Sequence, residues 1–112
     1  MTTPLIANLE KLLGGPRDGA LLRYSLGNEH LKAGHFAQAV IRLREAVERD
    51  AGYSAAWKLL GKALAEDGQG SEALAAYEQG IAVASARGDI QAAREMSVFA
   101  RRLRRQLPAA DH

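Results

Sequence analysis

The chain has no cysteine and only three prolines in 112 residues. Without cysteine it can form no disulfide, no thiolate metal site, no cysteine nucleophile and no thiol redox centre. No apolar run reaches the length of about 18 residues that a membrane-spanning helix needs. No basic segment precedes the apolar residues near the N-terminus, so the sequence predicts no signal peptide. These absences predict a cytoplasmic protein without a membrane span.

Charge of neither sign is in large excess, since the formal net charge is +2. Apolar residues make up 47% of the chain and charged residues 25%, which is typical of a single globular domain and excludes disorder of the whole chain. The basic excess lies near the C-terminus, in Arg101, Arg102, Arg104 and Arg105.

Strand signals are scarce as well, because no stretch alternates apolar and polar residues. Helical periodicity runs through almost the whole chain, so the sequence predicts an all-α fold of about six helices. The predicted helices run from Thr3, as cap, to Gly14; from Asp18 to Ala33; from Phe36 to Asp50; from Ser54, as cap, to Asp67; from Ser71, as cap, to Gly88; and from Asp89, as cap, to Gln106. The first helix is expected to bury Leu5, Leu9, Leu12 and Leu13.

The chain is similar to itself at an offset of 34 residues, which aligns Leu26-Gly27 with Leu60-Gly61. Small residues fall on equivalent positions of the two halves: Gly27, Ala39 and Ala46 in the first, and Gly61, Ala73 and Gly80 in the second. Helices that cross closely need small residues at the crossing, because larger side chains push the axes apart. The offset therefore predicts two helical hairpins of the same design.

The residues at 54–87 carry a recognisable signature: Trp57, Leu60, Gly61, Leu64, Ala73, Tyr77 and Gly80. This segment resembles a tetratricopeptide repeat. Residues 20–53 resemble a second copy, in which Arg23 stands at the position of the signature tryptophan. The proline that usually ends a repeat is missing from both copies, near Ala51 and near Arg87.

The resemblance implies a single domain folded as a right-handed α–α superhelix. Because each hairpin cannot bury its apolar face alone, the repeats need flanking helices. We expect residues 1–16 to form the N-terminal cap, residues 89–107 to form the C-terminal cap, and residues 108–112 to form a tail. Trp57 is expected to be substantially buried, since it lies on the apolar stripe of its helix.

No catalytic or cofactor motif accompanies these packing residues. The segment from Gly68 to Ala73 has the spacing of a dinucleotide fingerprint, but that motif must follow a strand, and a helix precedes it here. His30 and His35 flank a glycine turn at a spacing that does not suit a helical metal pair, so we interpret them as partly exposed turn residues. We expect no enzymatic activity, no cofactor and no metal.

The resemblance also implies a function, because members of the family bind short peptide segments on a concave face. The groove positions of the family correspond here to Tyr24, Asn28, Leu31, Lys58, Lys62, Arg94 and Arg101. The assignment of Arg94 and Arg101 assumes that the sixth helix begins a third repeat whose register is shifted by about two residues. The set holds four cations and no acid, which favours a partner with acidic side chains or a free C-terminal carboxylate. An ordinary solvated helix face would explain the two lysines equally well.

The match to the carboxylate clamp with which some members hold chaperone tails is incomplete. Asn28 occupies one clamp position, but Tyr24 and Leu59 replace a lysine and an asparagine. The expected function is therefore that of a small scaffold or adaptor with a protein or peptide partner, and not specifically that of a chaperone-tail adaptor.

Two further functions stay open at this point. Phe99 lies off the apolar stripe of the sixth helix, where it would either pack under the fifth helix or be exposed and contact a partner or a second copy of the chain. The arginines of residues 101–105 suggest an accessory role in nucleic-acid binding, but they also complement the helix dipole and have no aromatic residues for base stacking. We expect a monomer or weak homodimer that binds neither nucleic acid nor a membrane.

Overall fold

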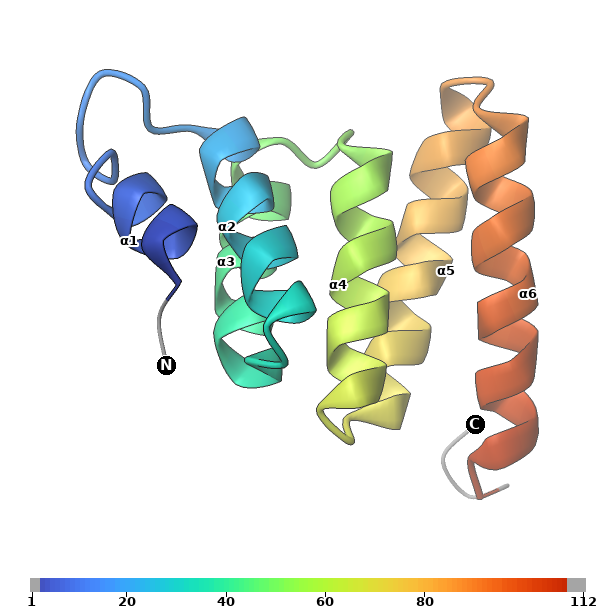
Figure 1. Ribbon diagram of the computed structural model, residues 1–112. Coiled ribbons are helices and arrows are strands. Elements are labelled where there is room, and N and C mark those ends of the chain that lie inside the picture. Colours follow the sequence, from blue (N-terminus) through green and yellow to red (C-terminus); the bar gives the residue numbers. More distant parts are fainter. Residues whose placement is uncertain (1–2, 109–112) are drawn as a thin grey trace.

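The computed structural model describes residues 3–108, which form six helices and no strand. The helices are α1 (Pro4–Glu10), α2 (Ala20–Lys32), α3 (Phe36–Arg49), α4 (Ser54–Glu66), α5 (Gly70–Ala86) and α6 (Ile90–Gln106). Helices α2 to α6 stand side by side in alternating directions, and α1 lies beside α2 at one end (Figure 1). The predicted all-α architecture is confirmed. Of the predicted tail, residues 109–112 lie outside the described residues.

Glycine turns end three of the helices. Gly34, Gly68 and Gly88 have φ values of 80°, 77° and 77°, a left-handed conformation that residues with a Cβ rarely adopt. In each turn the residue after the glycine donates its backbone N–H to a carbonyl five positions back: His35 to His30, Gln69 to Leu64, and Asp89 to Ala84. This is the hydrogen bond that closes a helix C-terminus around a glycine. The equal turns bring α3, α5 and α6 back antiparallel to the helices before them.

Glycine also allows the paired helices to approach each other. A Cβ added to Gly61 of α4 would lie 2.6 Å from Cε1 of Tyr77 on α5, which is well inside van der Waals contact. Gly27 of α2 faces Leu43 of α3 in the same way. Both glycines therefore lie at helix crossings, as the 34-residue offset predicts.

The buried side of α1 differs from the prediction. Ile6 is fully buried against α2, with Leu9 and Leu13 packed beside it. Leu5 and Leu12 are exposed, because the helix ends before Leu12 and its inner face is the one that carries Ile6. The predicted stripe was therefore wrong in two of its four members.

Two predicted helix caps are confirmed and two are wrong. Thr3 and Asp89 each accept a hydrogen bond from the backbone N–H three residues on, at 3.1 Å and 3.2 Å. Ser54 and Ser71 lie inside the first turns of α4 and α5, and neither helix has a side chain that caps its first backbone N–H groups.

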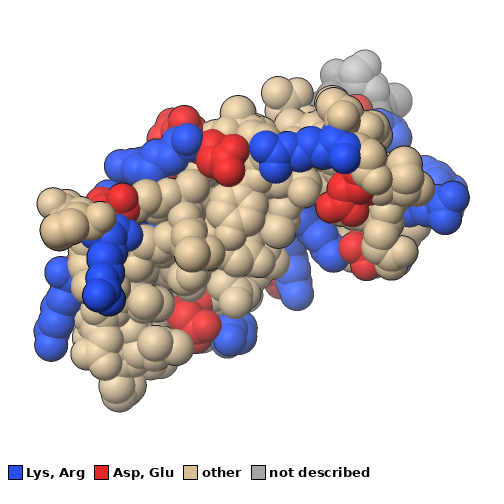
Figure 2. Space-filling model, turned by 90° about the horizontal axis from the view of Figure 1, so that it is seen from above, with Lys and Arg blue, Asp and Glu red and all other residues tan. Residues whose placement is uncertain are grey.

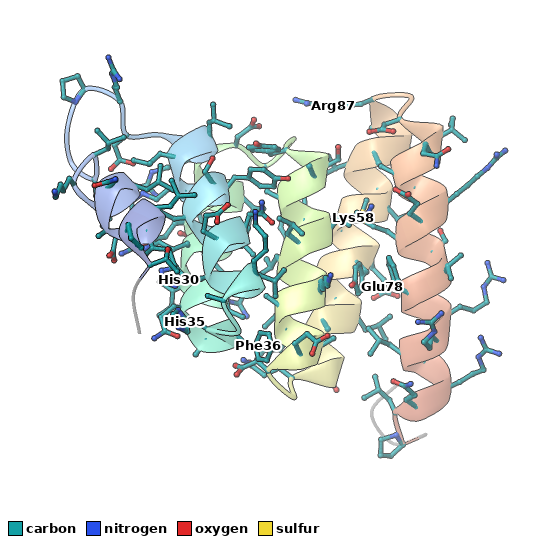
Figure 3. All side chains as sticks on the ribbon, viewed as in Figure 1. His30, His35, Phe36, Lys58, Glu78 and Arg87 are labelled. Atoms are coloured by element: carbon teal, nitrogen blue, oxygen red, sulfur yellow. The ribbon has the colours of Figure 1, made fainter. Side chains whose placement is uncertain are left out.

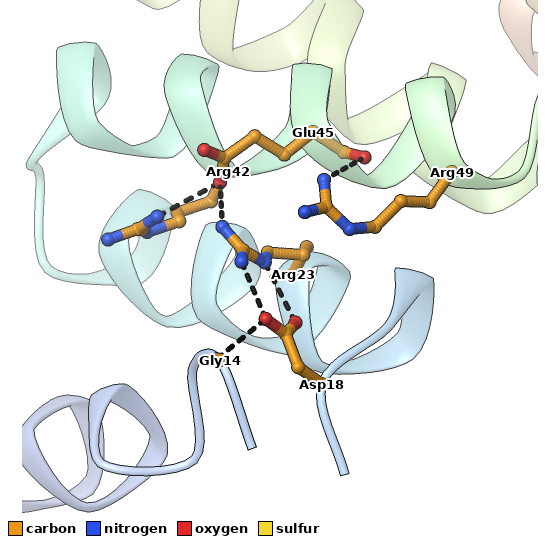
Figure 4. A network of polar contacts seen from close by, with 6 residues as sticks. All are labelled: Gly14, Asp18, Arg23, Arg42, Glu45 and Arg49. Atoms are coloured by element: carbon orange, nitrogen blue, oxygen red, sulfur yellow. Dashed lines mark hydrogen bonds and ion pairs between the residues drawn. The ribbon is translucent and has the colours of Figure 1, made fainter. Parts of the chain in front are cut away.

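A polar network occupies the place of the signature tryptophan in the first hairpin (Figure 4). Arg23 binds the Asp18 carboxylate through Nε at 2.9 Å and through Nη2 at 2.6 Å, and its Nη1 reaches Glu45 of α3 at 2.7 Å. Arg42 donates to the same Glu45 carboxylate at 2.9 Å. Hydrogen bonds from Arg23 and from the Gly14 backbone hold the pKa of Asp18 far below its usual range. Asp18 thus joins the α1–α2 loop to both helices of the hairpin and does not cap α2.

Trp57 is largely but not fully buried, which agrees with the expectation of substantial burial. Its Nε1 donates a hydrogen bond to the carbonyl oxygen of Ala51 at 2.8 Å. The indole packs against the main core, and one edge faces a shallow depression between α3 and α5. It therefore ties the loop before α4 to the second hairpin.

Candidate functional site

One side of the array, formed by α2, α4 and α6, is hollowed along its width. A cavity of about 500 Å³ lies between α4 and α6, and a shallower one of about 290 Å³ lies between α2 and α4. Leu59, Lys62 and Glu66 of α4 line both cavities, so the two form one continuous groove. We call it the inner groove and define it by Asn28, Leu31, Leu59, Lys62, Phe99 and Arg102.

The floor of the inner groove between α4 and α6 is apolar. The rings of Tyr77 and Phe99 stack with centroids 5.5 Å apart, and Leu59 and Leu103 lie beside them. Tyr77 is only 3% exposed, and this burial raises its pKa to about 12, so the phenol stays neutral at physiological pH. The half-buried Phe99 ring and the two half-buried leucines leave room for an apolar side chain of a bound segment.

The rim of the inner groove is basic, with two acids. Lys58 projects from α4 toward α6 (Figure 3), where its Nζ lies 2.8 Å from Oε1 of Glu95. The Lys58 hydrogen bond holds the pKa of Glu95 below its usual range. Within residues 3–108 neither Lys62 nor Arg102 makes an ion pair. Glu66 also lines the groove, so the groove contains an acid that is not among the predicted positions.

The structure brings together four of the seven groove residues predicted from the sequence: Asn28, Leu31, Lys58 and Lys62. Tyr24 lies one helical turn before Asn28 and lines neither cavity. Its ring packs instead against Tyr53, with centroids 4.8 Å apart.

Arg94 and Arg101 lie outside the inner groove, which corrects their predicted position. They line a separate depression of about 590 Å³ between α5 and α6. The residues that seat α6 on α5 are Ala93, Met96 and Ala100. This seating turns both arginines away from α4. The side chains of α6 that face α4 instead are Glu95, Phe99 and Arg102.

Of the two histidines, His30 differs from the prediction, whereas His35 is partly exposed as expected. His30 is only 6% exposed, and its Nδ1 lies 3.2 Å from Nδ1 of His35 (Figure 3). Since one nitrogen must donate and the other accept, the contact holds a single proton. Burial lowers the pKa of His30. In the part of the chain that the structure describes, no group of three or more histidines and carboxylates is placed to hold a metal ion.

The charges at one end of the array are mixed in sign (Figure 2). Viewed from the end where α2, α4 and α6 begin, basic and acidic side chains lie next to each other around the edge of an uncharged centre (Figure 2). Across residues 3–108 no helix combines the length and hydropathy that a membrane crossing requires.

Comparison with known proteins agrees with this architecture, although no family model matches the chain. It is 48% identical over 101 residues to the TPR repeat-containing protein PA0015 of Pseudomonas aeruginosa, an alignment that covers 90% of this chain and 96% of that protein. The solution structure of protein BPP2914 from Bordetella parapertussis is 40% identical, with a TM-score of 0.79 over 94% of this chain and 91% of that one.

A tetratricopeptide repeat domain protein from Salinibacter ruber is 31% identical, with a TM-score of 0.70 over 79% of this chain and 88% of that one. The identity to PA0015 extends over nearly the full length of both chains. Together with the two glycine-crossed hairpins, these similarities show that the chain belongs to the tetratricopeptide-repeat family.

Proposed function

We propose that this chain is a non-enzymatic interaction module that holds a peptide segment of a partner protein in the inner groove. Proteins of the tetratricopeptide-repeat type generally mediate protein–protein interaction. The observation that carries the proposal is the continuous groove across α2, α4 and α6, which combines an apolar floor with cations that have no acidic partner of their own.

The chemistry of the groove defines the kind of segment that fits. An apolar side chain would cover Phe99 and Leu103, which are only half-buried in the free protein. Carboxylates of the segment would then reach Lys62 and Arg102 at the rim. Lys58 contributes less, because Glu95 already binds it. The best ligand is therefore a short acidic segment with one apolar anchor, and a free C-terminal carboxylate would serve as one of its anions.

Two synthetic, fluorescein-labelled decapeptides test this proposal by fluorescence anisotropy. The first has a central leucine, flanking aspartates and a free C-terminus, and the second has asparagines in place of the aspartates and an amidated C-terminus. We expect the first to bind and the second to bind at least about tenfold more weakly. Binding of the first should weaken as salt rises, because exposed charges are screened.

Charge reversals locate the binding surface. The double variant Lys62→Glu/Arg102→Glu should lose at least about tenfold in affinity, since it replaces attraction by repulsion at both rim positions. The matched control is Lys11→Glu/Arg105→Glu, which changes the net charge equally at exposed positions that line neither cavity of the groove. Circular dichroism checks that both variants stay helical. Equal loss in the two variants, or equal binding of the two peptides, would overturn the proposal.

A further inference from the structure

The array has a second hollow surface at its C-terminal end, separate from the inner groove. The depression of about 590 Å³ between α5 and α6 is lined by eight residues from these two helices. We call it the terminal face and define it by Ile81, Ile90, Arg94, Ser97, Val98 and Arg101. None of these residues lines the inner groove.

The position of the terminal face in the array suits a helix. The helices alternate in their packing: among the helices before them, α3 and α5 pack chiefly against the one directly before, α2 and α4 respectively. A helix after α6 would pack against α6 in the same alternation, and six of the eight residues that line the terminal face belong to α6. Within residues 3–108 no helix covers this face.

The centre of the terminal face is apolar and accessible. Ile90 and Val98 are 53% and 48% exposed, and both line the same depression, so they form one apolar patch. They lie two turns apart on α6, with Ser97 beside them. The Ser97 hydroxyl donates to the carbonyl oxygen of Ala93 at 2.8 Å, so it presents no unpaired donor to an apolar ligand.

Two uncompensated cations flank this apolar strip. Arg94 and Arg101 lie about two turns apart, and no acid is among the eight lining residues. Within the described range neither arginine makes an ion pair, whereas Arg104 of the same helix binds Glu78 at 2.7 Å. A second copy of the chain docked face to face would bring arginine against arginine, which is unfavourable.

We propose that the terminal face binds an amphipathic helix of a partner protein, with an apolar stripe that covers Ile90 and Val98 and with carboxylates that reach Arg94 and Arg101. Such a helix would stand where the next helix of the array would stand. The proposal is independent of the inner groove, because the two surfaces share no residue.

Methyl NMR of the full chain with designed peptides tests the proposal. The probe is a 14-residue amphipathic helix with a leucine stripe flanked by glutamates, and its control carries lysines in place of the glutamates. We expect the glutamate peptide to shift the methyl signals of Ile81, Ile90 and Val98 and to leave those of Leu59 and Leu103 in the inner groove unchanged. Absence of binding, equal binding of the lysine peptide, or shifts confined to Leu59 and Leu103 would refute it.

Charge reversals separate this surface from the inner groove. Arg94→Glu/Arg101→Glu should weaken binding of the glutamate helix by at least about tenfold. The control Lys11→Glu/Arg105→Glu and the groove variant Lys62→Glu/Arg102→Glu should both retain it. If the groove variant loses binding instead, the helix occupies the inner groove and the terminal face has no such role.

Sedimentation of the chain without peptide tests whether a second copy of the chain, and not a partner helix, covers the terminal face. A dimer that is abolished by a polar substitution at Val98 would mean that a second copy covers the terminal face, and the proposal would fail. We expect no such dimer, because the arginines oppose it.

Discussion

Replacement of Gly61 by leucine tests whether the crossing of α4 and α5 determines the second hairpin. A Cβ at this position would lie 2.6 to 2.7 Å from three ring atoms of Tyr77. That ring cannot move freely, since it is only 3% exposed and is stacked on Phe99 with centroids 5.5 Å apart. The rest of a leucine side chain would need space that the ring fills. Either the ring leaves its place or the two helix axes separate.

The expected change in the free energy of unfolding combines two destabilising contributions and one stabilising contribution. Overpacking of a closely filled site costs about 1–3 kcal/mol, and several added carbons belong at the upper end of that range. Loss of the aromatic stack adds about 1 kcal/mol. Leucine regains about 1 kcal/mol, because glycine is a poor helix former. The free energy of unfolding should therefore fall by about 3 kcal/mol, which corresponds to a decrease in Tm of roughly 10–20 °C for a domain of this size.

Urea and thermal denaturation followed by circular dichroism measure this change. Gly70→Ala is the control, because a Cβ there meets only the end of the flexible Leu107 side chain, at 3.0 Å. It should leave the midpoint nearly unchanged. In a Tyr77→Ala background the added cost of Gly61→Leu should shrink, since the ring that obstructs the leucine is gone. A Gly61→Leu variant that melts like the parent, or that costs the same in both backgrounds, would refute the assignment of the crossing.

Three further predictions concern charged and titratable groups. Asp18→Asn should lower the urea midpoint at pH 7, and because the folded pKa of Asp18 is depressed, the difference from the parent should begin to shrink as pH falls below about 4 and should vanish only at the still lower pH of the folded pKa. The folded pKa of His30 is also lowered, so the parent should lose stability as pH falls below about 6.5, with a smaller loss in His30→Leu in the same urea series. Glu95→Gln should free Lys58 and raise the affinity of the acidic decapeptide a few-fold; unchanged or weaker binding in the anisotropy assay would contradict the role given to Lys58.

Much of the fold could be predicted from the sequence, because the decisive interactions are local or repeated. Left-handed turns favour glycine, so Gly34 and Gly68, at equivalent positions of the two repeats, indicate where α2 and α4 end. Close helix crossings need small residues, so the repeat offset locates Gly27 and Gly61 opposite large side chains. These constraints act on individual positions and do not depend on distant partners.

The groove residues of α6 could not be predicted in the same way. One residue along an α-helix turns the side chain by about 100°, so a register error of one position changes the helix face. The predicted residues Arg94 and Arg101 each lie one position before residues that face α4, Glu95 and Arg102. The register of α6 is decided by its packing on α5, where Met96 lies against Gly80, and the repeat pattern alone does not report this contact.

The polar network of the first hairpin was unpredictable for a different reason. Arg23 departs from the repeat signature, but its two partners are far apart from each other in the sequence. Asp18 precedes it in a loop, and Glu45 lies on the next helix. Only the folded chain brings these carboxylates to one guanidinium, which then links α2 to α3 where a tryptophan would otherwise pack.

The arrangement of α6 keeps the two proposed binding surfaces separate on one short chain. Phe99 and Arg102 face α4 and complete the inner groove, whereas their neighbours Val98 and Arg101 face away and form the terminal face. Since adjacent residues on a helix point about 100° apart, each surface can be changed without altering the other. A core substitution such as Met96→Ala would not distinguish them, because it would unseat α6 from α5 and disturb both surfaces together. Surface charge reversals on single faces of α6 are therefore the variants that can assign a partner to one surface.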